Sequence, residues 1–148
     1  MFSLKKYKDR GFTIVELLIV IVVIGILATL VITTYNGVQE KARDTKRKTD
    51  INALQGQIEA YEAENGNYPT LANVNSSTWR STNMKGLDPS ALEDPNGSTQ
   101  ALCATTTTNC YVFAVTPSGC DNSTTDCTGY TLTATLEGGG TYSKQNLN

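Results

Sequence analysis

Residues 12–32 form an almost continuous apolar run, FTIVELLIVIVVIGILATLVI, in which Glu16 is the only charged side chain. At about 1.5 Å per residue, a helix of this length spans about 31 Å, close to the thickness of the hydrocarbon core of a bilayer. An ionised carboxylate costs about 2.5–3.5 kcal/mol at the centre of a membrane helix and less near its end. The pattern therefore predicts a membrane-spanning helix in which Glu16 has a partner.

The helical pattern continues beyond the apolar run. Apolar or small side chains recur at steps of three and four residues, which predicts one buried stripe on an amphipathic helix. The residues of this stripe are Val38, Ala42, Thr45, Ile51, Leu54, Ile58 and Tyr61. Asn65-Gly66 is a helix-stop signal, and Pro69 prevents the helix from resuming. We therefore expect one helix of about 50 residues, apolar all round in its first half.

Two segments near the C-terminus have the pattern of strands, residues 111–115 and 130–136. In the second segment, threonines alternate with Tyr130, Leu132, Ala134 and Leu136, which indicates a half-buried strand. We expect an antiparallel hairpin with residues 117–129 as its loop, followed by a glycine turn and a last edge at Tyr142. The helical stripe at residues 51–61 would cover the sheet, which gives an α+β fold.

The segment between helix and hairpin, residues 67–109, has little periodicity and contains three of the four prolines. It is interpreted as a long connecting loop with one short helix at residues 88–94. Trp79, Met84 and Leu87 are the side chains expected to hold this loop against the core.

The net charge of −2 conceals a strong asymmetry. Residues 1–11 are basic, whereas residues 50–148 carry three basic side chains, Arg80, Lys85 and Lys144, against ten acidic ones. Phosphate binding needs dense lysine and arginine, so nucleic acid is not expected to be the main partner. A basic N-terminus before an apolar span predicts that the N-terminus stays cytoplasmic and the remainder is exported.

A basic run, KARDTKRK, occupies residues 41–48. One interpretation is binding to DNA or to an anionic surface. We prefer a solvated helix face, paired at helical spacing with Glu40, Asp44 and Asp50 or with acidic residues of neighbouring molecules, because no aromatic side chains are interleaved with it.

The cysteines are Cys103, Cys110, Cys120 and Cys127. An even number in an exported chain implies disulfides, with three possible connectivities. Zinc is disfavoured because the chain lacks histidine and closely spaced cysteine pairs. Local pairs, 103–110 and 120–127, are preferred because each closes a short loop beside a strand end, and a 110–120 linkage is the alternative.

The absence of histidine excludes Ser/His and Cys/His catalytic pairs, so we expect neither an enzyme nor a cofactor. The loop at residues 118–129 contains Asp121, Asn122 and Asp126, whose oxygens are of the kind calcium prefers. They follow no recognisable ligand register, and turns rich in Asp and Asn are common without metal. The sequence therefore predicts no metal site. These three residues are only weak candidates for calcium ligands.

The run GFTIVELLIVIVVIGILATL, residues 11–30, resembles the N-terminal segment of type IV pilins and of the pseudopilins of type II secretion. The segment ENGNYPT, residues 64–70, also resembles the corresponding part of many family members. In that family a prepilin peptidase cuts after the glycine, and the new N-terminal residue is N-methylated. The resemblance implies cleavage after Gly11, methylation of Phe12 and an assembly role for Glu16.

The resemblance also implies a domain organisation. Residues 1–11 are expected to be the leader peptide and residues 12–35 the transmembrane and filament-core helix. Residues 36–65 are expected to continue as an amphipathic helix. Residues 66–148 are expected to form a pilin-like globular region with an antiparallel sheet and disulfide-stapled loops.

The function implied is that of a structural subunit. It would be a single-pass membrane precursor and then polymerise into an extracellular filament for adhesion, twitching motility or DNA uptake. Glu16 would pair with the Phe12 amine of a neighbouring subunit; the alternative is that it snorkels at the membrane interface. A prepilin peptidase, an assembly platform and an ATPase are the partners implied. A secretion pseudopilin is the alternative, and a membrane-anchored ectodomain that never polymerises is a further one.

Overall fold

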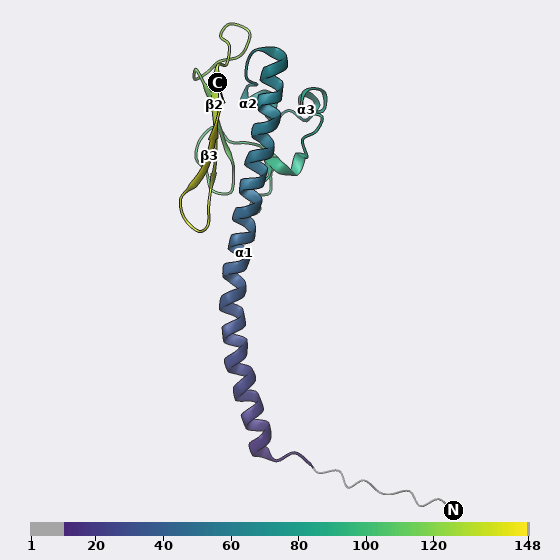
Figure 1. The fold of residues 1–148 in the computed structure, drawn as a ribbon, viewed down its shortest axis with the longest axis vertical. Coiled ribbons are helices and arrows are strands. Elements are labelled where there is room, and N and C mark those ends of the chain that lie inside the picture. Colours follow the sequence, from purple (N-terminus) through teal and green to yellow (C-terminus); the bar gives the residue numbers. More distant parts are fainter. Residues whose placement is uncertain (1–10, 148) are drawn as a thin grey trace, which may run out of the picture. The chain divides into compact units, whose positions relative to one another are not determined.

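The computed structural model describes residues 11–147, so that residues 1–10 of the leader expected at residues 1–11 lie outside this range (Figure 1). The helices and strands are α1 (Ile14–Asn65), α2 (Leu71–Asn75), α3 (Ser77–Asn83), the 3-10 helix η1 (Pro89–Leu92), β1 (Val112–Thr116), β2 (Gly129–Thr135) and β3 (Thr141–Gln145). The predicted α+β fold, a long N-terminal helix and a small antiparallel sheet, is confirmed. The chain divides into two compact units, with the boundary between Gln39 and Glu40. We call residues 12–38 the apolar segment and residues 40–147 the head.

Helix α1 ends where the sequence predicts. Gly66 has a φ of 76°, a left-handed conformation that glycine adopts without strain. Its backbone N–H donates to the carbonyl of Glu62 at 2.6 Å, and the Asn65 amide donates to the carbonyl of Tyr61 at 2.9 Å. These hydrogen bonds satisfy carbonyl groups that the end of the helix would otherwise leave unpaired.

The sheet has the strand order β1-β2-β3, and both pairs are antiparallel. Phe113 pairs with Leu132, and Ala134 pairs with Tyr142. The alternation predicted for the middle strand is confirmed, since its even-numbered residues are buried up to Ala134. They pack in one core with three buried side chains of the helical stripe, Ile51, Leu54 and Ile58.

The prediction of a buried stripe is wrong for its first half. Val38, Ala42 and Thr45 are exposed, whereas Arg47 and Asp50 are buried. Periodicity of apolar residues could not reveal this, because the buried positions in this part of α1 are charged and have carboxylate, ammonium or hydroxyl partners.

The interpretation of residues 67–109 as one loop is wrong for α2 and α3. Both helices are short, and each begins at a hydroxyl cap. Thr70 accepts from the backbone N–H of Asn73 at 3.2 Å, and Ser76 accepts from that of Trp79 at 3.3 Å. The short helix expected at residues 88–94 is present as η1. Trp79, Met84 and Leu87 pack on the core, as predicted.

Two disulfides join Cys103 to Cys110 and Cys120 to Cys127, which are the local pairs preferred from the sequence. Cys103 also lies beside β1: its N–H donates to the carbonyl of Tyr111 at 2.8 Å, and its carbonyl accepts from Phe113 at 2.9 Å. The loop closed by the first disulfide is therefore tied to the edge of the sheet.

Candidate functional site

Helix α1 begins with a capping box formed by Thr13 and Glu16. The Thr13 hydroxyl accepts from the backbone N–H of Glu16 at 3.2 Å. One carboxylate oxygen, Oε2 of Glu16, accepts from the Thr13 backbone N–H at 2.8 Å and from its hydroxyl at 2.7 Å. The two residues thus satisfy two backbone donors that the start of a helix leaves free.

The capping box supplies a partner for Glu16 that we did not expect from the sequence. The signal was visible, since a threonine three residues before a glutamate is the usual form of this cap. The cap leaves the negative charge uncompensated, because Thr13 is neutral and no basic group of the described residues lies within 4.0 Å of Glu16. None of these residues donates to its second oxygen, Oε1.

The apolar segment exposes its large side chains on all sides of the helix. From Phe12 to Val38, the described Val, Leu, Ile, Phe and Tyr side chains are 46–84% exposed. In the described part of the chain, α1 is the one helix long and apolar enough to cross a membrane. Apolar surface of this extent marks a site that contacts lipid or other protein surface.

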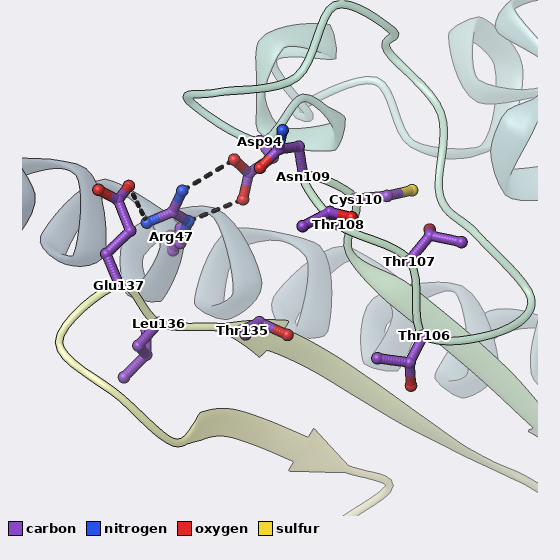
Figure 2. A pocket seen from close by; sticks show the side chains of 10 residues that line it. All are labelled: Arg47, Asp94, Thr106, Thr107, Thr108, Asn109, Cys110, Thr135, Leu136 and Glu137. Atoms are coloured by element: carbon purple, nitrogen blue, oxygen red, sulfur yellow. Dashed lines mark hydrogen bonds and ion pairs between the residues drawn. The ribbon is translucent and has the colours of Figure 1, made fainter.

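The head contains a buried ion-pair cluster centred on Arg47 (Figure 2). The guanidinium forms a two-pronged pair with Asp94, with Nε–Oδ2 at 2.7 Å and Nη2–Oδ1 at 2.9 Å. Its Nη1 donates to Asp44 at 2.8 Å and to Glu137 at 2.7 Å. Two-pronged pairs with carboxylates are among the strongest hydrogen-bonded contacts in proteins. The cluster joins α1 to the segment after η1 and to the turn between β2 and β3.

Glu137 is shared by a second arginine, because Arg43 Nε donates to its Oε1 at 2.8 Å. The hydrogen bonds from Arg43 and Arg47 lower the pKa of the Glu137 carboxyl to about 2. Asp44 accepts the backbone N–H groups of Glu137 and Gly138, at 2.9 Å and 3.0 Å, so it holds the turn in place as well.

Most of the basic side chains of residues 41–48 thus form ion pairs within the chain. Lys46 pairs with Asp50 at 2.9 Å, and Arg47 pairs with Asp44, which confirms pairing at helical spacing. The prediction of a solvated face is wrong for Arg47, which is 2% exposed. A cavity of about 250 Å³ adjoins the cluster and is lined in part by Thr106, Thr107 and Thr108. The arginine of this cavity is already neutralised by carboxylates.

The loop that contains the calcium candidates forms hydrogen bonds with other parts of the head. Asn122 donates to the carbonyl of Tyr68 at 2.7 Å and accepts from the N–H of Cys127 at 2.7 Å. The Tyr68 N–H donates to the carbonyl of Cys127 at 2.9 Å. The stapled loop therefore holds the chain just after α1.

Asp121 organises the same loop. Its carboxylate accepts the backbone N–H groups of Thr124, Ser123 and Thr125, which lower its pKa to about 2. Asp126 lies exposed. Over residues 11–147, no group of three or more histidine, cysteine, aspartate or glutamate side chains is arranged to hold a metal ion.

The start of the chain matches a family model. Residues 6–32 match the prokaryotic N-terminal methylation motif. The start of the chain therefore carries the methylation motif that the resemblance to pilins and pseudopilins implied. The resemblance stated from the sequence is therefore confirmed.

Similar proteins are found among secretion proteins. The type II secretion system core protein G of Dickeya chrysanthemi is 44% identical over 63 residues, which are 43% of this chain and 41% of the relative. The protein of the same name from Escherichia coli is 46% identical over 63 residues, 43% of each chain. That from Pseudomonas aeruginosa is 33% identical over 67 residues, 45% of this chain and 47% of the relative. The matched part is less than half the length of each relative. No solved structure matches the chain.

The N-terminal methylation motif includes all three residues predicted to act in processing and assembly, namely Gly11, Phe12 and Glu16. Gly11 and Phe12 are exposed and precede α1 in non-helical backbone. A peptide bond in such a segment is accessible to a peptidase. Thr13 and Glu16 both follow this bond, so a chain beginning at Phe12 keeps both residues of the capping box.

Proposed function

We propose that the chain is a structural subunit that polymerises through its apolar segment. The observation that carries the proposal is an apolar helix without an apolar core of its own, joined to an N-terminal methylation motif. Such a surface is unstable in water and needs lipid or other helices around it. The same segment spans the membrane in the precursor and lies among the helices of neighbouring subunits in the filament.

The proposed processing is cleavage after Gly11 and N-methylation of Phe12 by a prepilin peptidase. Cleavage creates a cationic amine on Phe12, four residues before Glu16. In the filament, this amine meets the Glu16 carboxylate of a neighbouring subunit, whose Oε1 has no donor among the described residues. A subunit out of step would leave two charges unpaired in apolar surroundings, so the pair sets the register of assembly.

Two kinds of filament are candidates. The relatives named above favour a pseudopilus of type II secretion. A surface pilus for adhesion, twitching motility or DNA uptake is the second candidate, favoured by the two disulfides and the exposed threonine-rich loops. For DNA, the head offers little basic surface, because Arg43, Lys46 and Arg47 already hold carboxylates. An assembly platform and an ATPase are proposed partners in either case.

The test is intact-mass and N-terminal analysis of protein sheared from the surface of its native cells. We expect a chain that begins at methylated Phe12 and sediments as filaments. A processed chain that stays within the cell envelope would identify the pseudopilus rather than the pilus. A chain that retains Met1 and occurs only in the membrane fraction would refute polymerisation and identify an anchored ectodomain.

A further inference from the structure

The head buries a second arginine that has no carboxylate partner. Arg80, in α3, is 8% exposed, and no acidic group of the described residues lies within 4.0 Å of it. The one hydrogen bond of its guanidinium within residues 11–147 is from Nη1 to the carbonyl of Val74, at 2.6 Å. Arg47, by contrast, holds three carboxylates. No buried side-chain nitrogen of the described residues lacks a hydrogen-bond partner, so the remaining guanidinium nitrogens of Arg80 reach solvent and are accessible to an anion.

Arg80 lines a cavity of about 280 Å³ that also contains a second cation, Lys85. Lys85 is exposed and likewise has no carboxylate within 4.0 Å among the described residues. These are two of only three basic side chains in residues 50–148, where ten are acidic. Because both line one cavity, they form a local positive site in a part of the chain that is otherwise mostly acidic.

None of the acidic side chains in residues 11–147 forms an ion pair with a cation of this cavity. Asp88 is adjacent in sequence to Pro89, which lines the cavity, but its Oδ1 accepts the backbone N–H of Ser90 at 2.9 Å. It serves as the cap of η1. The hydroxyl group of Ser77 also lines the cavity and can donate to an anion, whereas the Ser81 hydroxyl already donates to the carbonyl of Thr78 at 2.7 Å.

The walls of the cavity identify the kind of anion. With Nη1 bound to Val74, the Nε and Nη2 edge of Arg80 remains as a planar fork that matches a carboxylate or a phosphate. The remaining lining is apolar, from Met84, Leu87 and Pro89, and would be left uncovered by a free phosphate ion. The volume is just below the range of about 300–1,000 Å³ typical of drug-sized ligands, so the ligand is small.

We propose that Arg80 and Lys85 form a binding site for a carboxylate that carries a small apolar group. The carboxylate lies between the guanidinium, the ammonium and the Ser77 hydroxyl, and the apolar group lies against Met84 and Leu87. The last residue of a polypeptide chain, when its side chain is apolar, belongs to this chemical class.

The experiment is an NMR titration of the ¹⁵N-labelled full chain in neutral detergent with isovalerate. We expect saturable shifts of the backbone amides of Ser77, Arg80, Ser81 and Lys85. Isovaleramide has the same apolar group without the charge and should cause no such shifts. Inorganic phosphate should bind more weakly than isovalerate, because it leaves the apolar wall uncovered.

Substitutions complete the test. Lys85→Gln removes an exposed charge and should weaken isovalerate binding about threefold to fivefold. Arg80→Lys keeps a charge but removes the fork and should weaken it about tenfold. Lys144→Gln, which removes a cation outside the cavity, should leave the affinity unchanged. Absence of saturable shifts with isovalerate, equal shifts with the amide, tighter binding of phosphate, or unchanged affinity in Lys85→Gln would each overturn the proposal.

Discussion

The apolar segment and the head differ in the burial of their apolar side chains and in the partners of their charged side chains. In the head, apolar side chains such as Leu54 and Leu132 are fully buried, and the buried Arg47 holds carboxylates of its own chain. In the apolar segment, the large side chains are exposed, and among residues 11–147 the carboxylate of Glu16 is hydrogen-bonded only to the neutral Thr13. The apolar core and the Arg47 cluster of the head are thus formed within one chain, whereas the exposed apolar segment is suited to contact with lipid or other protein surface.

The comparison has a direct consequence for mutations. Changes in the head should alter its free energy of unfolding, which is measurable in the full chain in neutral detergent. Trp79, the only tryptophan, packs on Tyr61 with ring centroids 4.9 Å apart, so its fluorescence reports on the head. Changes in the apolar segment should leave this free energy unchanged and act on assembly.

The largest effect on the head is expected for Arg47→Met. The substitution leaves Asp94 buried without its cation, which typically costs about 3–5 kcal/mol of unfolding free energy. Denaturant unfolding followed by Trp79 fluorescence measures this loss. The control is Lys41→Met, an exposed lysine of the same basic run with no carboxylate within 4.0 Å among residues 11–147, for which a change within about 0.5 kcal/mol is expected. Equal losses in the two variants would contradict a structural role for the cluster.

A matched pair of leucines tests the difference between the two regions. Leu54→Ala should destabilise the head by about 3 kcal/mol, because it removes a fully buried side chain and leaves a cavity. Leu27→Ala, in the apolar segment, makes the same chemical change at an exposed position and should leave the unfolding of the head unchanged. A comparable loss in Leu27→Ala would show that the apolar segment is part of the folded core, against our account.

Removal of a disulfide should have the next largest effect. The double substitution Cys120→Ser and Cys127→Ser frees a short loop and should cost about 2 kcal/mol, judged from the chain entropy of the unfolded state. The Cys103–Cys110 pair closes a loop of the same sequence separation, 7 residues, and serves as the control. We expect the larger loss for the 120–127 pair, because its loop also holds the backbone of Tyr68. An equal or smaller loss would show that these contacts add nothing to stability.

The smallest effect is expected from pH. Arg43 and Arg47 lower the pKa of Glu137 from 4.5 to about 2 in the folded head. Ionised Glu137 therefore stabilises the head at pH values above its pKa in the unfolded chain. This stability is lost as the pH falls from about 4.5 to about 2. Glu137→Gln should therefore have a flatter dependence of unfolding free energy on pH in this window. Between pH 7 and 5 the two curves should run parallel, and identical slopes below pH 4.5 would contradict the assignment.

Local and periodic features were predictable from the sequence. The end of α1 at Asn65 follows from Asn65-Gly66 and Pro69, and the middle strand follows from the alternation around Leu132. Both signals are contained in a few consecutive residues. The N-terminal motif was recognisable for the same reason, since residues 6–32 carry all of it.

The remaining features depend on contacts that a sequence pattern does not contain. Arg47 can be buried because the folded chain brings the carboxylates of Asp94 and Glu137, 47 and 90 residues away in sequence, into contact with it. Helices α2 and α3 are too short to show a helical repeat of apolar residues. Their only signals in the sequence are the capping residues Thr70 and Ser76. The capping role of Glu16 is encoded in its spacing from Thr13, whereas the cost of a charge in an apolar helix predicts a partner in another molecule.

The central claim is that the charge of Glu16 is completed by a neighbouring subunit, and Glu16→Gln tests it most directly. Glutamine retains the capping box, so the helix and its membrane insertion should be unchanged, while the charge is removed. Thr13→Ala is the converse control, because it removes the capping hydroxyl and keeps the carboxylate. The measurement is the yield of sedimentable filaments from cells that express each variant at equal levels. We predict that Glu16→Gln yields processed subunits without filaments and that Thr13→Ala still assembles; normal filaments from Glu16→Gln would contradict the account.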